Sequence, residues 1–217
     1  MIKILLNRLD ELSTLELDKP EDFDQIKELL NQLSEPRVIQ YLLTHYTDQL
    51  LSYCEEYDFF TKIALYHTPN DKLRLRLHLF LPGYANRIHH HRWNYAAKIL
   101  RGAYTQSLYG KKQDFDIETI DISSIKPNLI TTHTQGDCYW IHRDYVHSIR
   151  AEPNTISLCL RGPSKEDKFW VIDQKAETKW WQYGAKSETY EEKKIKSISY
   201  NDLQRIKQQM MTLLGDF

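Results

Sequence analysis

The period of the hydrophobic positions changes along this chain. Over residues 1–56 apolar side chains recur every three or four positions, which is typical of amphipathic helices. In the stretch "PEDFDQIKELLNQLS" the shared face holds Phe23, Ile26, Leu29 and Leu30. The pattern predicts helices over residues 1–56. A last stretch with the same period, "SYNDLQRIKQQMMTLLGDF", predicts one more helix at the end of the chain.

Between these helical zones the period is two. In "KLRLRLHLFLPG" every second residue is a leucine, which predicts a strand with one apolar face. Similar short runs recur between turn sequences such as "TPND", "IKPN" and "TQGD". Many short strands without helices between them predict an antiparallel sandwich or barrel. We therefore expect a single domain with a helical extension (1–56), a barrel (57–176) and an edge strand followed by a helix (177–217).

The residues that alternate with the leucines are Arg74, Arg76 and His78. Because charged side chains are seldom buried, we expect this face to be the solvated outer face of the sheet. Of the three, His78 is the one that we would most readily move inside, because it lies nearest the loop that leads to His89.

Composition and charge exclude several classes of protein. The formal net charge is −1, so no bulk electrostatic field favours nucleic acid or an anionic membrane. The apolar patch at the N-terminus is too short for a signal peptide or a membrane span. Three widely spaced cysteines indicate reduced thiols. We expect a cytoplasmic protein that binds neither nucleic acid nor membrane.

Three consecutive histidines in "RIHHHRWNYAAKILRG" are the first candidate for chemistry. On a strand, residues two apart share a face, so His89 and His91 point one way and His90 the other. Taken alone, such a run is typical of a solvated turn. Two imidazoles on one face can bind an ion if another strand supplies a third ligand. Neutral imidazoles suit Fe(II), Zn, Ni or Cu and leave positions open for other ligands.

The spacing of glycines and histidines supplies a resemblance. One segment reads Gly83-x5-His89-x-His91-x3-Tyr95-x6-Gly102, and a later one reads Gly136-x5-His142-x-Asp144-x2-His147. These resemble the two motifs of the cupin superfamily, Gly-x5-His-x-His-x3-Glu-x6-Gly and Gly-x5-Pro-x-Gly-x2-His. The resemblance implies a mainly β fold, a cupin-type double-stranded β-helix (jelly-roll) barrel. It also implies that His147 joins His89 and His91 as the third metal ligand.

One departure from the motif points to a branch of that superfamily. Tyr95 stands where most cupins have a glutamate ligand, so the expected ion keeps three neutral donors and favours an anionic co-ligand. Such sites are similar to those of the thiol dioxygenases, which implies Fe(II) and dioxygen. Their late strand reads Ser-x-His-x-Tyr, whereas this chain has Ser157-x-Cys159-x-Arg161. Their substrate-binding arginine aligns loosely with Lys62.

These residues suggest roles. Arg161, facing the metal, would clamp a substrate carboxylate with its guanidinium fork. Tyr95 would either donate a hydrogen bond toward bound oxygen or simply fill the glutamate's space. Trp93 would be an apolar wall of the site or an ordinary core tryptophan. The expected substrate-binding set is Arg161, Lys62, His78 and Trp93, with Tyr95 and Arg161 as the catalytic candidates.

Three functions remain open at the level of sequence. The first is a mononuclear non-haem iron oxygenase or dioxygenase that acts on a small anionic or amino-acid-like molecule. The second is a binding module, with or without a metal, whose helices form a partner surface. The third is a Zn or Ni lyase or isomerase, because ligand type alone does not determine the metal. Cupin barrels often dimerise through edge strands, so the resemblance also raises a homodimer as an arrangement to test.

Overall fold

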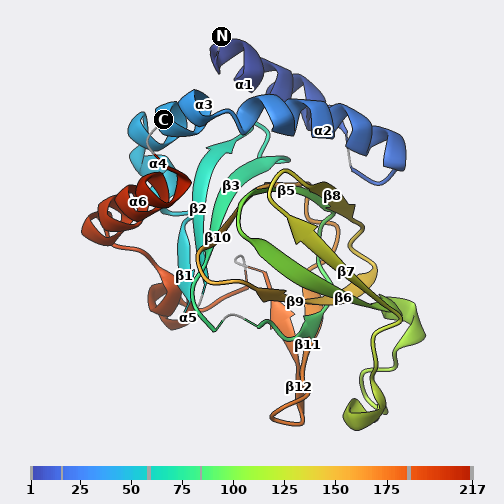
Figure 1. The fold of residues 1–217 in the computed structure, drawn as a ribbon. Helices are drawn as coiled ribbons and strands as arrows, with labels where there is room; N and C mark the ends of the chain where they lie inside the picture. The colour runs from blue at the N-terminus through green and yellow to red at the C-terminus, as the bar shows by residue number, and fades with distance from the viewer. Residues whose placement is uncertain (1, 16, 58–59, 84, 185–186, 216–217) are drawn as a thin grey trace.

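The computed structural model describes residues 2–15, 17–57, 60–83, 85–184 and 187–215. Helices from both ends of the chain gather on one side of two β-sheets (Figure 1). Positions 58–59, at the start of the expected barrel, lie outside the described residues. No helix in the described ranges is long and apolar enough to cross a lipid bilayer.

The helices begin where the sequence supplies suitable first residues. They are α1 (Ile2–Glu11), α2 (Pro20–Leu33), α3 (Pro36–Thr44), α4 (Asp48–Leu51), α5 (Tyr190–Lys196) and α6 (Tyr200–Leu214). Helices α2 and α3 each begin at a proline, whose fixed φ suits the first helical position. Ser199 caps α6 by accepting a hydrogen bond from the backbone N–H of Asp202.

In the described part of the chain, two antiparallel sheets of six strands each make up the barrel. In spatial order the first sheet contains β1 (Glu55–Tyr57), β2 (Phe60–His67), β3 (Arg74–Phe80), β10 (Thr155–Arg161), β5 (Tyr95–Arg101) and β8 (Cys138–Ile141). The second contains β12 (Thr178–Tyr183), β11 (Lys168–Asp173), β4 (Ile88–His89), β9 (Tyr145–Ala151), β6 (Ala103–Lys111) and β7 (Leu129–Thr134).

The strand order is that of a jelly roll. Strands β3-β10-β5-β8 are consecutive neighbours in one sheet, and β4-β9-β6-β7 are consecutive neighbours in the other. The chain therefore crosses between sheets at every step from β3 to β10 except at the β6–β7 hairpin. Strands β1 and β2 widen the first sheet, and β11 and β12 widen the second. The expected mainly β jelly roll, with helices before and after it, is confirmed.

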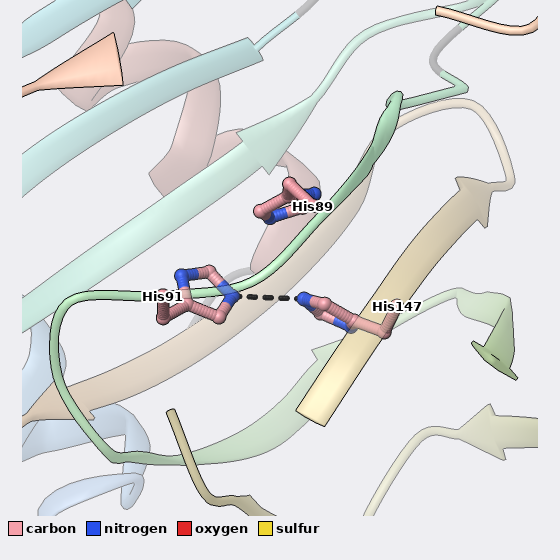
Figure 2. Close-up of side chains that lie close together, drawn as sticks. All are labelled: His89, His91 and His147. Atoms are coloured by element: carbon pink, nitrogen blue, oxygen red, sulfur yellow. Dashed lines mark hydrogen bonds between the residues drawn. The ribbon is translucent and has the colours of Figure 1, made fainter. Parts of the chain in front are cut away.

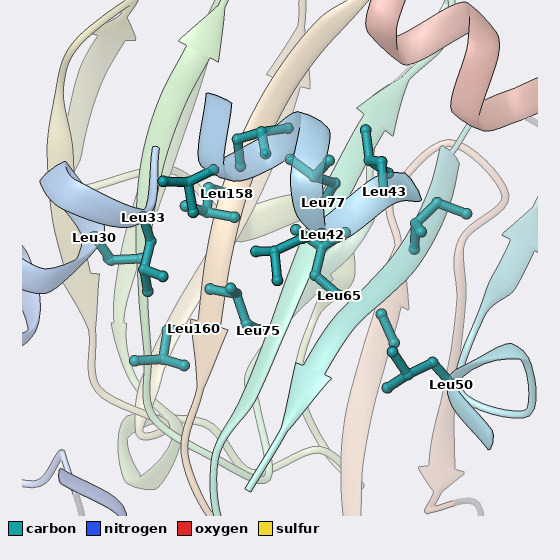
Figure 3. Close-up of a cluster of buried hydrophobic side chains, with 14 of the residues drawn as sticks. Leu30, Leu33, Leu42, Leu43, Leu50, Leu65, Leu75, Leu77, Leu158 and Leu160 are labelled. Carbon is teal, nitrogen blue, oxygen red and sulfur yellow. The ribbon is translucent and has the colours of Figure 1, made fainter. Parts of the chain in front are cut away.

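The main hydrophobic core lies between the first sheet and the helices (Figure 3). Leucines of β3 and β10 face leucines of α2 and α3 across this layer: Leu75, Leu77, Leu158, Leu160, Leu30, Leu33, Leu42 and Leu43. Amphipathic helices need an apolar surface to pack against, and the leucine face of the sheet provides it.

This packing overturns the expectation that Arg74 and Arg76 point to solvent. The exposed fraction of the surface area is only 8% for Arg74 and 7% for Arg76. Because the leucine face is covered by helices, the alternate residues of β3 must point toward the second sheet. His78 lies on this inner face as well.

Candidate metal centre

Three histidines named from the sequence come together between the sheets (Figure 2). His89 on β4 lies directly opposite His147 on β9, and His91 follows two residues after His89. The ring centroid of His89 lies 4.7 Å from the ring centroid of His91 and 4.7 Å from that of His147. The ring centroids of His91 and His147 are 4.9 Å apart. One nitrogen from each ring lies within 4.8 Å of the other two, so the three can reach a single ion.

The backbone settles the tautomer of His89. Its Nδ1 lies 2.8 Å from the carbonyl oxygen of Arg87. A carbonyl can only accept, so Nδ1 carries the proton and donates it. The lone pair of Nε2 is then available to a metal, which is the usual arrangement for a ligating histidine.

The Nε2 atoms of His91 and His147 lie 2.8 Å apart. Two ligands about 2.1 Å from one ion and about 90° apart are separated by about 3 Å, so this spacing suits adjacent positions around a metal. The Nδ1 atom of His147 is buried and has no hydrogen-bond partner among the described residues. With one nitrogen of each ring within 4.8 Å of the others, His89, His91 and His147 fit a divalent ion that accepts nitrogen ligands.

Burial keeps these imidazoles neutral. It lowers the pKa of His89 to about 4 and the pKa values of His91 and His147 well below their ordinary value. Neighbouring histidines add to the effect, because a second positive charge in the cluster would be repelled. A neutral imidazole is the form that binds a metal, so no proton has to leave near neutral pH.

The middle histidine of the run serves the backbone. His90 is 2% exposed, and its Nε2 accepts a hydrogen bond of 3.1 Å from the backbone N–H of Trp170. Its Nδ1 must then carry the proton and lies 3.2 Å from the carbonyl oxygen of His91. His90 thus ties the metal-facing segment to β11 and takes no part in the cluster.

Two aromatic residues named from the sequence flank His91. The ring centroid of Tyr95 lies 5.0 Å from that of His91, and Tyr95 forms a side-chain hydrogen bond with Tyr139. Trp93 is half-buried, with its ring centroid 6.1 Å from that of His91. Both rings can wall the space beside the cluster.

Arg161 lies against one of these two aromatic residues, Trp93. It is 9% exposed, and its guanidinium carbon lies 5.0 Å from the centroid of the Trp93 ring. One Nη donates to the carbonyl oxygen of Gly162 at 2.8 Å, while Nε is buried without a partner in the described part of the chain. Burial and the charge of Arg76 lower the pKa of Arg161 to about 9.

Lys62 on β2 and His78 on β3 lie directly opposite each other on the inner face of the first sheet. The Nζ of Lys62 is 3.1 Å from a carboxylate oxygen of Glu55, so Lys62 already has an internal partner. Burial alone would raise the pKa of Glu55, but the charges of Lys62 and other cations lower it. The His78 ring packs 5.1 Å from that of Phe60, and its Nε2 is buried without a partner among the described residues.

The inward guanidinium of Arg76 is the feature that sequence reasoning missed. Arg76 lies opposite Cys159 of β10, on the face that also carries Arg161. The signal was present in the helices: if their apolar faces cover the leucines of β3, the arginines of β3 must face inward.

Comparisons with known proteins give structural neighbours only. No model of a protein family and no curated protein matches this chain. The structure of KdgF from Halomonas sp. is 17% identical, covering 51% of this chain and 86% of that one, with a TM-score of 0.39. An RmlC-like cupin from Shewanella frigidimarina is 15% identical, covering 57% and 94%, with a TM-score of 0.40. Hydroxypropylphosphonic acid epoxidase from S. wedmorenis is 16% identical, covering 48% and 51%, with a TM-score of 0.36.

Proposed function

We propose that this protein is a cupin-type mononuclear non-haem metal enzyme of the oxygenase class. His89, His91 and His147 would hold the ion, with Fe(II) as the metal, and the substrates would be dioxygen and a small anionic molecule. The observation that carries the proposal is the convergence of three neutral imidazoles inside the jelly roll, within 4.8 Å of one another.

The donor set explains why the substrate should be an anion. Three neutral imidazoles leave the full double charge on a divalent ion, so an anionic group is the favoured additional ligand. Fe(II), when bound, would supply the activation of dioxygen. The protein's own part is to present three lone pairs, to exclude bulk water by burial, and to hold the substrate in one orientation.

Residues around the cluster can provide that orientation. The guanidinium of Arg161 lies against Trp93, and Trp93 lies against His91, so Trp93 connects the proposed anion anchor with one of the proposed metal ligands. Tyr95 stays close to His91 and shares a hydrogen bond with Tyr139. We assign Arg161 to substrate anchoring, Trp93 to the apolar wall, and Tyr95 to a hydrogen-bonding position at the edge of the site.

The proposal is tested by metal analysis of protein purified without oxygen, followed by oxygen uptake with a panel of thiols, amino acids and small carboxylic acids. We expect about one iron per chain and uptake that depends on one class of substrate and is lost in His147→Ala. A chain without bound metal, or equal uptake by His147→Ala, would contradict the proposal. Activity with Zn or Ni but none with Fe(II) would replace it with lyase or isomerase chemistry in the same pocket.

A further inference from the structure

The inner face of the first sheet carries more positive charge than its carboxylates balance. Its cations are Lys62 of β2, Arg74 and Arg76 of β3, and Arg161 of β10. Glu55 lies 3.1 Å from Lys62, and Asp71 lies 2.8 Å from Arg74. Among the described residues no carboxylate forms an ion pair with Arg76 or Arg161, and the Nε atom of each is buried without a hydrogen bond.

The two arginines that lack an ion-pair partner among the described residues occupy neighbouring positions on the sheet. Arg76 lies opposite Cys159, and Arg161 is two residues along the same strand, so the two arginines are diagonal neighbours on one face. Such positions are about 7–8 Å apart, well within the combined reach of two arginine side chains. Both side chains can therefore converge on one bound group.

We propose that Arg76 and Arg161 together bind a group with two negative charges, at the end of the substrate that does not contact the metal. The group is either one tetrahedral dianion, such as a phosphate or phosphonate, or a pair of carboxylates. The link to a substrate rests on the proposed function; the anion site itself is defined by residues of the first sheet.

Among the described residues, none of the carboxylates near Arg76 forms a direct ion pair with it. Its neighbours across the sheet are Ala64 on β2 and Cys159 on β10. Burial raises the pKa of Cys159 to about 12, so the thiol stays neutral. Glu55 acts on Arg76 only at a distance, and it already contacts two lysines, Lys62 at 3.1 Å and Lys196 at 2.9 Å.

The charge of the two arginines decides the charge of the ligand. Arg76 and Arg161 repel each other, and this repulsion contributes to the lowered pKa of Arg161. Glu55 attracts Arg76 and Asp71 attracts Arg161, but each carboxylate already forms an ion pair with another cation. A monoanion would therefore leave one of the two guanidiniums without a direct anionic partner in a desolvated site. Two negative charges balance both, and a guanidinium fork matches phosphate and carboxylate oxygens alike.

The experiment is isothermal titration calorimetry of the full chain with sulfate, malonate and formate, at constant ionic strength and with the metal removed by a chelator. We expect sulfate or malonate to bind with one site per chain and at least tenfold more tightly than formate. Arg76→Met and Arg161→Met should each weaken that binding tenfold or more. Arg87→Met is the matched control, because Arg87 is exposed and pairs with Asp173 at 2.7 Å, and it should stay within twofold of wild type.

The comparison of sulfate with malonate distinguishes a tetrahedral head group from two carboxylates. Dianion binding that is absent in the wild type, no tighter than formate, or unchanged in Arg76→Met would overturn the proposal. If Arg76→Met does not fold, Arg76→Lys takes its place: it keeps the charge and loses the fork, and unchanged sulfate affinity there would count against the site. The comparison of sulfate and malonate with formate is made on the wild type, so this part of the test does not depend on any variant folding.

His147→Ala separates this inference from the proposed function. The variant should bind sulfate as the wild type does, since the proposed anion site is formed by Arg76 and Arg161 and includes none of the three histidines. In the wild type, intact dianion binding without any metal-dependent oxygen uptake would contradict the oxygenase proposal alone. Intact oxygen uptake with no role for Arg76 in dianion binding would contradict the anion site alone.

Discussion

His91 and His147 face each other through their Nε2 atoms at 2.8 Å, although 56 positions separate them in the sequence. Their neighbour His89 points its own ring toward both, while its Nδ1 is held by a backbone carbonyl. The consecutive residue His90 turns away and binds the backbone of β11. Adjacent histidines of one run therefore have different roles, and this difference can be measured.

We expect His91→Ala and His90→Ala to separate metal binding from stability. His91→Ala removes one of three donors and should abolish binding of one metal per chain. His90→Ala should keep the metal but leave the Trp170 N–H buried without an acceptor, at a cost of about 1–3 kcal/mol in the free energy of unfolding. Metal content and urea unfolding test both statements; full metal content in His91→Ala would refute the assignment.

Tyr95 should not bind the metal in the resting protein. Its phenol has a reference pKa of about 10, and a side-chain hydrogen bond to Tyr139 holds it in place. Tyr95→Phe should therefore retain the full amount of metal. The ferric wild type should lack an intense visible band of the tyrosinate-to-iron kind. Such a band in the wild type that disappears in Tyr95→Phe would show that Tyr95 is a ligand.

His78 should make the protein less stable in acid. Burial, assisted by the charges of Lys62 and Arg76, lowers the pKa of His78 well below its ordinary value in the folded state. Below pH ~6.5 the unfolded chain takes up a proton at this residue that the folded chain does not, so stability falls as pH falls, by at most ~1.4 kcal/mol per pH unit.

His78→Leu removes this proton uptake. Urea unfolding at pH 7.5, 6.0 and 5.0 should therefore show a shallower loss of stability in His78→Leu than in the wild type, with both proteins in the same metal state. Parallel losses in the two proteins would mean that His78 is free to take up a proton in the folded state.

The helices should contribute stability through the leucine layer. Leu43 of α3 is fully buried in that layer, so Leu43→Ala should lower the free energy of unfolding by about 2–5 kcal/mol. Leu129 of β7 is 53% exposed, and Leu129→Ala should change it by no more than about 0.5 kcal/mol. Similar losses in the two variants would mean that the helices do not depend on this layer.

Much of this architecture follows from periodicity. The alternation around Leu75 and Leu77 predicts a strand with one apolar face, and the spacing of two predicts that His89 and His91 share a face. Periodicity does not reveal which face of a sheet is covered, because both faces of β3 repeat every second residue. The expectation for Arg76 was wrong for that reason: it assumed that charge implies solvent, whereas the helices bury the leucines.

Which distant strands pair with each other also cannot be predicted from a single sequence. His147 could be named only through the spacing of a motif, since nothing local links it to the run at 89–91. The partner of Lys62 was not predicted either. Glu55 comes close because β1 and β2 pair in a register that places Glu55 opposite Lys62. This register depends on backbone geometry that composition does not encode.

The most direct test is anomalous diffraction at the iron edge from crystals grown with Fe(II) in the absence of oxygen. We predict one strong peak between the two sheets, about 2.0–2.2 Å from one nitrogen each of His89, His91 and His147. A map with no peak there and with the His91–His147 contact unchanged would contradict the account, as would a peak bound by other residues.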